Sequence, residues 1–526
     1  MNRVRIGSIG ALVVIGMGAA PALAQESVQA PASAAALTLT LDEAIRLAQQ
    51  NNPAWLSARN DADVAEWGVR SAYGELLPSA NANLGMQYQA PGTPSLGGIF
   101  TAEELGIGRT PEYYFSSYGL ELSYRLSPAT IFGIGEARAN RRAVSSRVNA
   151  ARFTMVETVT RQYLAALRAR DALRYAQEAV KRSAESWELA RARVQVGAAS
   201  PLDSLQAAVE LGRARVEVVQ AEATLETEKL RLLEQVGIAV EDSVSLASDF
   251  KVFEPTWTRA SLLERALANN PELRAARASE DATTAALRVA RSAYLPSLTL
   301  SADWSGFASE NGDPQSLIEE ALDISDSRIA SCEQLNAISA GLSQPLSGFP
   351  VDCQAEFTLD QADFNRLVAN NDVFPFDFNK QPLTVSLFVS LPIFQGFDRE
   401  ERIEMAQAAH DDARHDQRAA ELRLRTAVAS ALESLESSHR SVEIEATNRE
   451  LARLRFELAQ ERYRLGVAGT IESPGAGNIA ATSPFIELQQ AAADVAQADQ
   501  SYLDSVYTFH ESLVALEAAV GEQLRP

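Results

Sequence analysis

Histidine and cysteine, the residues of many metal and nucleophilic sites, are scarce in this chain. Its 526 residues include four His and two Cys. Basic charge is also in deficit, with 47 Lys and Arg against 69 Asp and Glu, which disfavours nucleic-acid binding because that needs a basic surface. The sequence has no nucleophile elbow, P-loop or dinucleotide fingerprint. We therefore expect neither an enzyme nor a cofactor or metal site.

Long apolar runs are also missing beyond the first residues, so we expect no membrane helix in the mature chain. Residues 1–24 have the features of a secretory signal peptide: Arg3 and Arg5 precede an apolar segment that ends in a small-x-small cleavage site. An N-terminal anchor is the alternative, but the apolar run is short for a span. Removal of the two arginines takes the formal net charge from −22 to −24. Residues 25–40 then form an N-terminal extension.

The rest of the chain is a tandem repeat. The motif Asn51-Asn52-Pro53 recurs as Asn269-Asn270-Pro271, and Leu77-Pro78-Ser79 recurs as Leu295-Pro296-Ser297 at the same offset of 218 residues. Such self-similarity marks one structural unit used twice. We place the first repeat at 41–255 and the second repeat at 257–526.

Each repeat opens with helix-start signals. Thr40 with Glu43, and Ser261 with Glu264, have the spacing of a capping box. In each Asn-Pro pair, the Asn suits an N-cap and the Pro suits the first helical position. We therefore expect a second helix to start at each Pro.

Four segments alternate apolar and polar residues with a period of two, which is typical of strands with one apolar face. They lie near 81–90 and 117–126 in the first repeat and near 297–305 and 383–391 in the second. A length near ten residues fits a tilted membrane strand. An ordinary soluble sheet is the alternative.

A long helix pair follows the second strand of each repeat, at 136–236 and at 399–520. The first helix of each pair ends at Gly197 or Gly466, and the next helix starts at a Ser-Pro pair. Apolar residues in these next helices recur at steps of three and four, which indicates coiled-coil packing.

The number of strands has a consequence if the strands span a membrane. Lipid cannot satisfy the hydrogen bonds of a sheet edge, so a spanning sheet must close. Four strands cannot close, because about eight form the smallest membrane barrel. Several chains would therefore share one barrel, and three chains would supply twelve strands with room for a lumen.

The sequence resembles the TolC family of outer-membrane efflux proteins. The signal peptide, the doubled unit, both repeated motifs and Arg462-Tyr463-Arg464-Leu465-Gly466 carry this resemblance. It implies an α+β membrane protein of the bacterial outer membrane, in which a homotrimer forms a twelve-stranded β-barrel that continues into an α-helical barrel across the periplasm. It also implies a periplasmic adaptor (membrane fusion) protein and an inner-membrane pump of the RND, ABC or MFS class as partners.

The same resemblance implies a gate at the periplasmic tip, formed by acidic and tyrosine side chains. Tyr463 and Asp203 match family positions, although helix packing for Tyr463 and helix capping for Asp203 remain alternatives. The second repeat departs from the pattern: Ile486 stands where an acid is expected, after an insert of about 14 residues. Glu472 or Glu487 could replace that acid. The adaptor would meet the tip turns, represented by Gly197, Ser200, Gly466 and Ser483.

A long acidic segment, 306–380, separates the third and fourth strands. It contains thirteen Asp or Glu against three basic residues, and long loops of outer-membrane barrels face the exterior. In an exported protein its two cysteines, Cys332 and Cys353, indicate a disulfide rather than free thiols. Short helices are expected at Leu317–Leu322 and Leu359–Leu367. Two interpretations of the segment remain as alternatives: a disulfide-pinned cap over the pore, and a solvated surface excursion.

These expectations lead to one function. The chain is expected to be the outer-membrane channel subunit of a tripartite efflux or type I secretion system, a passive duct for substrates delivered by the pump. The alternative is a periplasmic coiled-coil adaptor or scaffold without a pore. The sequence does not identify the cargo.

Overall fold

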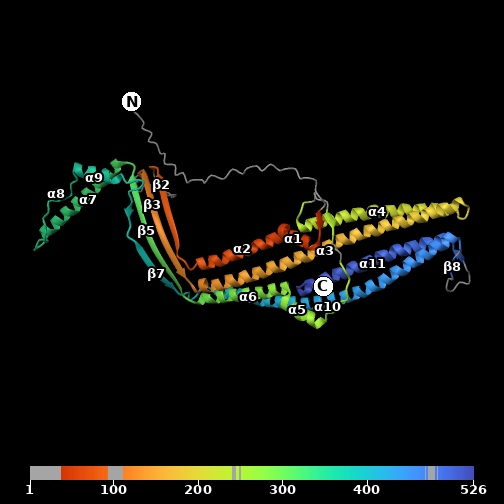
Figure 1. Ribbon diagram of the computed structural model, residues 1–526. Helices are drawn as coiled ribbons and strands as arrows, with labels where there is room; N and C mark the ends of the chain where they lie inside the picture. Colours follow the sequence, from red (N-terminus) through yellow and green to blue (C-terminus); the bar gives the residue numbers. More distant parts are fainter. Residues whose placement is uncertain are drawn as a thin grey trace, which may run out of the picture.

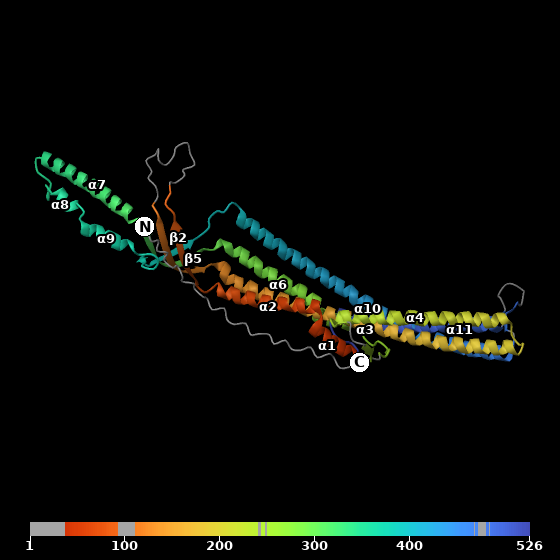
Figure 2. The same ribbon diagram turned by 90° about the horizontal axis from the view of Figure 1, so that it is seen from above.

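The computed structural model describes residues 37–92, 111–239, 244–247, 250–467, 469–471, 480–482 and 484–525. The expected signal peptide, 1–24, lies outside these residues. Most of the loop that follows the strand expected near 81–90 also lies outside them. The molecule is elongated, with a sheet toward one end, long helices extending from it, and a helical excursion beyond the sheet (Figures 1 and 2). Among the described residues, no helix has both the length and the apolar character to cross a membrane.

The two repeats have the same order of elements. The first contains α1 (Leu41–Asn51), α2 (Pro53–Gly74), β2 (Ser79–Gln89), β3 (Tyr113–Leu126), α3 (Pro128–Gln195) and α4 (Pro201–Val236). The second contains α5 (Arg259–Asn269), α6 (Pro271–Arg291), β5 (Ser297–Asn311), β7 (Thr384–Ser390), α10 (Asp398–Leu465) and α11 (Pro484–Val520).

Helices α3 and α10 run the length of the helical part. Each has 68 residues, which corresponds to about 100 Å at 1.5 Å per residue. α3 packs against α2 and then α4, whereas α10 packs against α6 and then α11. α3 begins at Pro128, eight residues before the expected start, because the Oγ of Ser127 accepts a hydrogen bond from the Thr130 N–H at 3.1 Å and Pro128 occupies the first helical position.

The sheet has five strands: β2, β3, β5 and β7 pair in that order, and the two-residue strand β6 (Asn379–Lys380) also pairs with β5. All four pairings are antiparallel. β3 and β5 pair from Tyr113↔Asn311 to Leu126↔Leu298, so both strands are longer than the alternating pattern indicated. Directly paired residues lie on the same face of a sheet. The register places the apolar positions of all four strands on one face: Leu120 pairs with Ala82 and Trp304, and Ala302 pairs with Leu122 and Val385.

The opposite face of this sheet is polar. Glu121 pairs with Asn81 and Asp303, and Asp303 pairs in turn with Thr384. The outer strands, β2 and β7, are largely exposed and each has one edge without a strand partner among the described residues. A two-faced sheet with two open edges is therefore the first feature that a functional account must explain.

The repeated Asn-Asn-Pro motif forms a joint at which two helices meet a third. Asn52 caps α2 through an Oδ1 contact of 2.9 Å with the Trp55 N–H, and its Nδ2 donates to the Gln235 carbonyl near the end of α4 at 2.7 Å. Asn270 repeats this arrangement, with Leu273 at 2.9 Å and the Ala519 carbonyl of α11 at 3.0 Å. The motif therefore ties the start and end of each repeat together.

A glycine completes each joint. Gly237 and Gly521 end α4 and α11 with positive φ angles of 81° and 78°. A Cβ on Gly237 would lie 2.4 Å from the Asn51 carbonyl oxygen, and a Cβ on Gly521 would lie 2.9 Å from that of Asn269. The backbone of one element thus lies directly against the end of another in both repeats.

Two short strands, β1 (Leu37–Leu39) and β4 (Val244–Leu246), pair in parallel beside the first joint. The Tyr163 hydroxyl of α3 donates to the Leu39 carbonyl at 2.8 Å, and Tyr163 is fully buried. The largest cores of the described residues lie in this middle region around α1 and α5, and a third core lies where the long helices end.

One expected cap is wrong. Ser261 does not cap α5; Thr258 does, and its Oγ1 accepts from the Ser261 N–H at 3.4 Å. Thr258 is the residue 218 positions after Thr40, which caps α1. The local Ser-x-x-Glu spacing was misleading because the repeat offset, and not the local motif, identifies the equivalent residue.

The acidic segment after β5 is mostly helical, contrary to the expected loop with short helices. The helix expected at Leu317–Leu322 extends through 28 residues. Two strands in the tip insert were also not expected. The additional elements are α7 (Pro314–Gly341), α8 (Cys353–Phe357), α9 (Gln361–Asn371), β6 (Asn379–Lys380), β8 (Gly469–Ile471) and β9 (Ala480–Thr482).

Replacement of Gly237 by Ala tests the joint. A side chain here has to adopt the left-handed region, at about 1–2 kcal/mol, and also displaces the Asn51 carbonyl, so we expect a loss of at least about 2 kcal/mol in unfolding free energy. Denaturant unfolding followed by circular dichroism measures the loss. Gly212→Ala is the control, because a Cβ there has no neighbour within 4 Å and helix propensity favours Ala. An equal effect of both changes would contradict the joint.

Candidate functional site

The end of the molecule farthest from the sheet, which we call the tip, contains the turns after α3 and α10 (Figure 1). Gly197 and Gly466 form these turns with positive φ angles of 73° and 74°. Gly466 donates to the Arg462 and Tyr463 carbonyls, and Gly197 donates to the Val194 carbonyl at 3.0 Å. Both glycines are therefore helix-ending residues that allow the chain to reverse.

Tyr463 lies inside the tip. Only 2% of it is exposed, and it packs against Phe485 with ring centroids 5.5 Å apart. The Arg193 guanidinium lies over its ring at 4.8 Å. Burial, together with the nearby Asp203 carboxylate, raises the pKa of the Tyr463 phenol, and Arg193 acts in the opposite direction. Its hydroxyl has no hydrogen-bond partner among the described residues.

Asp203 and Glu487 are both in the first turns of their helices. Ser200 caps α4: its Oγ accepts a hydrogen bond from the Leu202 N–H at 3.2 Å. Asp203 is half-buried in the first turn of α4, where the helix dipole stabilises a negative charge. Glu487 pairs with Arg462 at 2.9 Å and thereby joins α11 to α10. The tip thus brings Asp203, Tyr463 and Glu487 into one region, whereas Glu472 and Ser483 lie outside the described residues.

Beside the tip core, α3, α4 and α11 enclose an open groove of about 450 Å³. Small residues line much of it, including Ala179 and Ser183 of α3 and Ala493 of α11. Small side chains permit close approach of another helix. Sequence analysis did not indicate this groove, because it is formed by three helices from both repeats.

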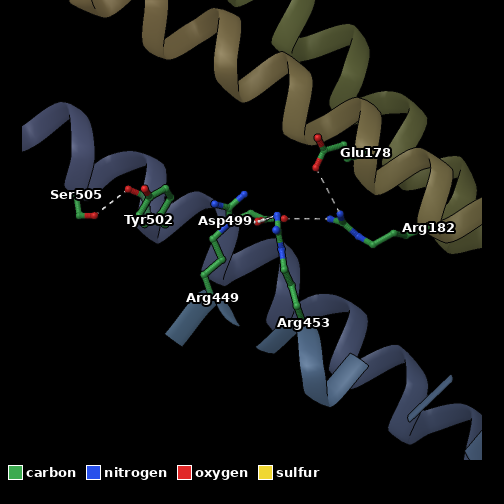
Figure 3. Close-up of polar contacts among 7 residues, drawn as sticks. All are labelled: Glu178, Arg182, Arg449, Arg453, Asp499, Tyr502 and Ser505. Atoms are coloured by element: carbon green, nitrogen blue, oxygen red, sulfur yellow. Dashed lines mark hydrogen bonds and ion pairs between the residues drawn. The ribbon is translucent and has the colours of Figure 1, made fainter. Parts of the chain in front are cut away.

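Farther from the tip, one buried carboxylate joins three arginines (Figure 3). The Asp499 side chain of α11 is 2% exposed. It lies 2.8 Å from Arg449 and 3.0 Å from Arg453, both on α10, and 3.4 Å from Arg182 on α3. Arg182 also lies 4.0 Å from Glu178. We call Asp499 and these three arginines the Asp499 cluster.

The Asp499 cluster links the two repeats, because α3 belongs to the first and α10 and α11 to the second. The Arg449 guanidinium also lies over the rings of Tyr175 and Tyr502, at 5.2 and 4.8 Å. Sequence reasoning missed the cluster. An available signal was Asp499 itself, an acid in the middle of an otherwise apolar helix face between Val495 and Tyr502.

The expected disulfide can be placed. Cys332 of α7 and Cys353 of α8 are joined by a disulfide with Cα atoms 5.8 Å apart. In the part of the chain that the structure describes, no three His, Cys, Asp or Glu side chains gather closely enough to hold a metal ion.

Long paired helices, a two-faced sheet and a doubled topology together define an outer-membrane channel type of fold, and sequence comparison agrees. The family model for outer membrane efflux proteins matches residues 44–237, 262–347 and 355–522. The chain therefore belongs to the outer membrane efflux protein family, as the resemblance predicted. Membership places it in the outer membrane, with extension into the periplasm.

Two known relatives match this chain at similar levels of sequence identity. The chain is 27% identical over 274 residues to outer membrane protein TolC of Vibrio cholerae serotype O1. It is 26% identical over 269 residues to cobalt-zinc-cadmium resistance protein CzcC of Cupriavidus metallidurans. Each match covers 51% of this chain and 58% of the relative, so the chain matches little more than half of each relative's length.

Solved structures share the fold over a larger part of the chain. The Campylobacter jejuni CmeC outer membrane channel aligns with 92% of this chain and 87% of its own, at a TM-score of 0.65 and 15% identity. The Vibrio cholerae outer membrane protein VceC aligns with 92% of this chain and 97% of its own, at a TM-score of 0.63 and 14% identity. At such identities the likeness concerns the fold.

Substitution of Asp499 by Asn tests the cluster. The change leaves three guanidiniums close together without their carboxylate, and loss of one partner of a buried ion pair costs about 3–5 kcal/mol. Because the arginines are partly exposed, we expect a loss of about 2 kcal/mol or more in unfolding free energy. Denaturant titration of the purified protein checks this value.

Asp494→Asn is the matched control on the same helix. Asp494 pairs only with Arg455, and both side chains are about half exposed, so its loss costs about 1 kcal/mol or less. If the two variants were equally stable, the Asp499 cluster would not be a significant link between the repeats.

Proposed function

We propose that this chain is the outer-membrane channel subunit of a tripartite efflux or type I secretion system, a passive exit duct for substrates that an inner-membrane pump delivers. The observation that carries the proposal is the register of the sheet. It places the apolar positions of four strands on one face and Asn81, Glu121 and Asp303 on the other. This arrangement suits a sheet with lipid on one side and water on the other.

The open sheet edges support a shared barrel. β2 and β7 would leave a row of backbone groups without hydrogen bonds if they faced lipid, and each such group costs several kcal/mol. Pairing of β7 of one copy with β2 of the next satisfies both edges. Three copies supply twelve strands, which leave room for a lumen.

The helices support the same assembly through a contrast between α4 and α11. In α11 the expected apolar row is buried within the chain: Phe485, Leu488 and Val495 are each 1% exposed. In α4 the corresponding row is open to solvent, and the α4 core contacts come from other residues. The open α4 row comprises Leu202, Leu205, Val209, Val216, Val219 and Leu230.

α10 carries a second open row, on which Ile444, Leu451 and Leu458 follow each other at seven-residue steps and are each about 60% exposed. Apolar coiled-coil rows without a partner are expected to pair with another chain. Packing of α4 of one copy against α10 of the next would join three helix sets into an α-helical barrel below the sheet. The homotrimer thereby accounts for the sheet edges and both helix rows.

We further propose that a periplasmic adaptor docks at the tip. The turns at Gly197, Ser200 and Gly466 are exposed, and the groove between α3, α4 and α11 opens beside them with a size and lining that suit a helix with small contact residues. In this scheme Asp203, Tyr463 and Glu487 hold the tip helices together, and the adaptor acts on them from outside.

Val216→Asp on α4 tests the assembly. The new charge would be buried in the proposed α4–α10 contact, so we expect loss of the heat-modifiable trimer on gels and of conductance in planar bilayers. Thr224→Asp is the control, because Thr224 is exposed on α4 to the side of the open row. The unmodified protein should fractionate with the outer membrane and conduct; a soluble monomer without conductance would refute the proposed function.

Ala493→Trp tests the docking groove. A large side chain would fill the space that the adaptor helix is proposed to occupy, so we expect strong loss of adaptor cross-linking in cells with no loss of trimer. Gln497→Trp is the control, since Gln497 is exposed on α11 but does not line the groove. Equal cross-linking in both variants would place the adaptor elsewhere.

A further inference from the structure

Helix α7 projects beyond the sheet as one arm of the helical excursion (Figures 1 and 2). One of its faces is covered by its own hairpin. Ile329 and Cys332 are buried against Cys353, Val351 and Phe357 of the returning chain. This side of α7 is therefore already occupied.

The excursion holds α7 in a defined orientation. At its base, the Asn311 N–H donates to Asn371 Oδ1 at 2.9 Å, and Asn371 Nδ2 donates to the Asn311 carbonyl at 2.7 Å. In its middle, Asn336 bonds both the N–H and the carbonyl of Val351, at 2.9 and 2.8 Å, beside the disulfide. A surface on α7 is thus presented by a braced element and not by a free loop.

A second face of α7 is apolar and has no partner among the described residues. Ile324 and Ile338 are each 49% exposed. With about 100° per residue, they lie on a row roughly 100° around the helix from the buried face. The row follows steps of four and three, the spacing of a coiled-coil seam. Its members are Leu317, Ala321, Ile324, Arg328, Ser331, Leu335 and Ile338.

The charges of α7 are arranged around this row. Four of its acids, Glu319, Asp323, Asp326 and Glu333, lie on the far flank, so the strongly acidic character of the segment does not oppose contact at the apolar row. Glu320 and Arg328 stand on opposite borders of the row, about 80° apart. Neither has an ion-pair partner in the part of the chain that the structure describes.

We propose that the apolar row of α7 is covered by α7 of the other copies of this chain, so that three α7 helices form a parallel bundle at the outer mouth of the channel. The inference rests on the trimer of the proposed function. Around a threefold axis, one border of each helix faces the opposite border of its neighbour, so Glu320 of one copy and Arg328 of the next face the same groove, with their Cα atoms about 12 Å apart along the axis. The acids on the far flank then face solvent.

The dimensions allow this contact. Twelve strands spaced 4.8 Å apart and tilted by about 40° form a barrel with a radius of about 12 Å. α7, with 28 residues, spans about 42 Å, so it is long enough to reach the axis from the rim. Arg328 and Ser331 put polar side chains at two successive positions of the row, and polar side chains at such positions set register and copy number in coiled coils at some cost in stability.

Cysteine cross-linking of the full-length chain in outer membranes tests the bundle. Ile338→Cys with a short bismaleimide is expected to give covalent dimers, because copies of this residue would meet at the axis and each reagent molecule joins two thiols. Asp326→Cys, on the acidic flank, is the control and is expected to remain mostly monomeric on denaturing gels. The native disulfide leaves no other thiol to react.

A charge exchange in the Ile338→Cys background adds a second measurement. Glu320→Lys is expected to lower the yield of cross-linked product several-fold by placing like charges together, and Arg328→Glu in addition is expected to restore it. An intact heat-modifiable trimer in which Ile338→Cys gives no cross-linked product, or no rescue by the second change, would overturn the α7 bundle and leave the proposed function standing. Absence of the trimer in the unmodified protein would overturn both.

Discussion

The unpaired edges of the sheet are the constraint from which the rest of the architecture follows. A sheet with one apolar face can exchange water for lipid only if every backbone N–H and C=O remains hydrogen-bonded. The four long strands of one chain leave β2 and β7 open. In the trimer that we propose, closure by further copies fixes the spacing of the helices that continue from the strands, α2, α3, α6 and α10. The open rows on α4 and α10 then become contacts and not defects.

The sequence allowed prediction of the elements that depend on local periodicity or on the repeat. Alternating residues identified the four strands, and two glycines identified the ends of the long helices. The extra length of β3 and β5 could not be predicted, because it depends on pairing between Tyr113 and Asn311, residues from different repeats. The cap of α5 is a similar case: the Ser261-x-x-Glu264 spacing is a local pattern, whereas the 218-residue offset of the repeat identifies Thr258 as the cap.

The candidate site was less predictable. The apolar rows of α4 and α11 look alike in sequence, yet one is exposed and the other buried, since only three-dimensional packing decides which row faces the chain's own core. The Asp499 cluster draws residues from α3, α10 and α11 that are separated by as many as 317 positions. No spacing rule connects such residues. Tyr463 was identified, but its burial against Phe485 and Arg193 could be seen only in the structure.

The two joints, Asn52-Pro53 with Gly237 and Asn270-Pro271 with Gly521, also have a mechanical consequence. At the first joint α2 begins and α4 ends, and at the second joint α6 begins and α11 ends. Only α3 and α10 continue past the joints without interruption, for 68 residues each. Force applied at the tip therefore has only two unbroken paths to the sheet in each chain. The segmented helices are joined only through the contacts of the joints, so a load on α4 or α11 reaches α2 or α6 through the side chains of Asn52 and Asn270.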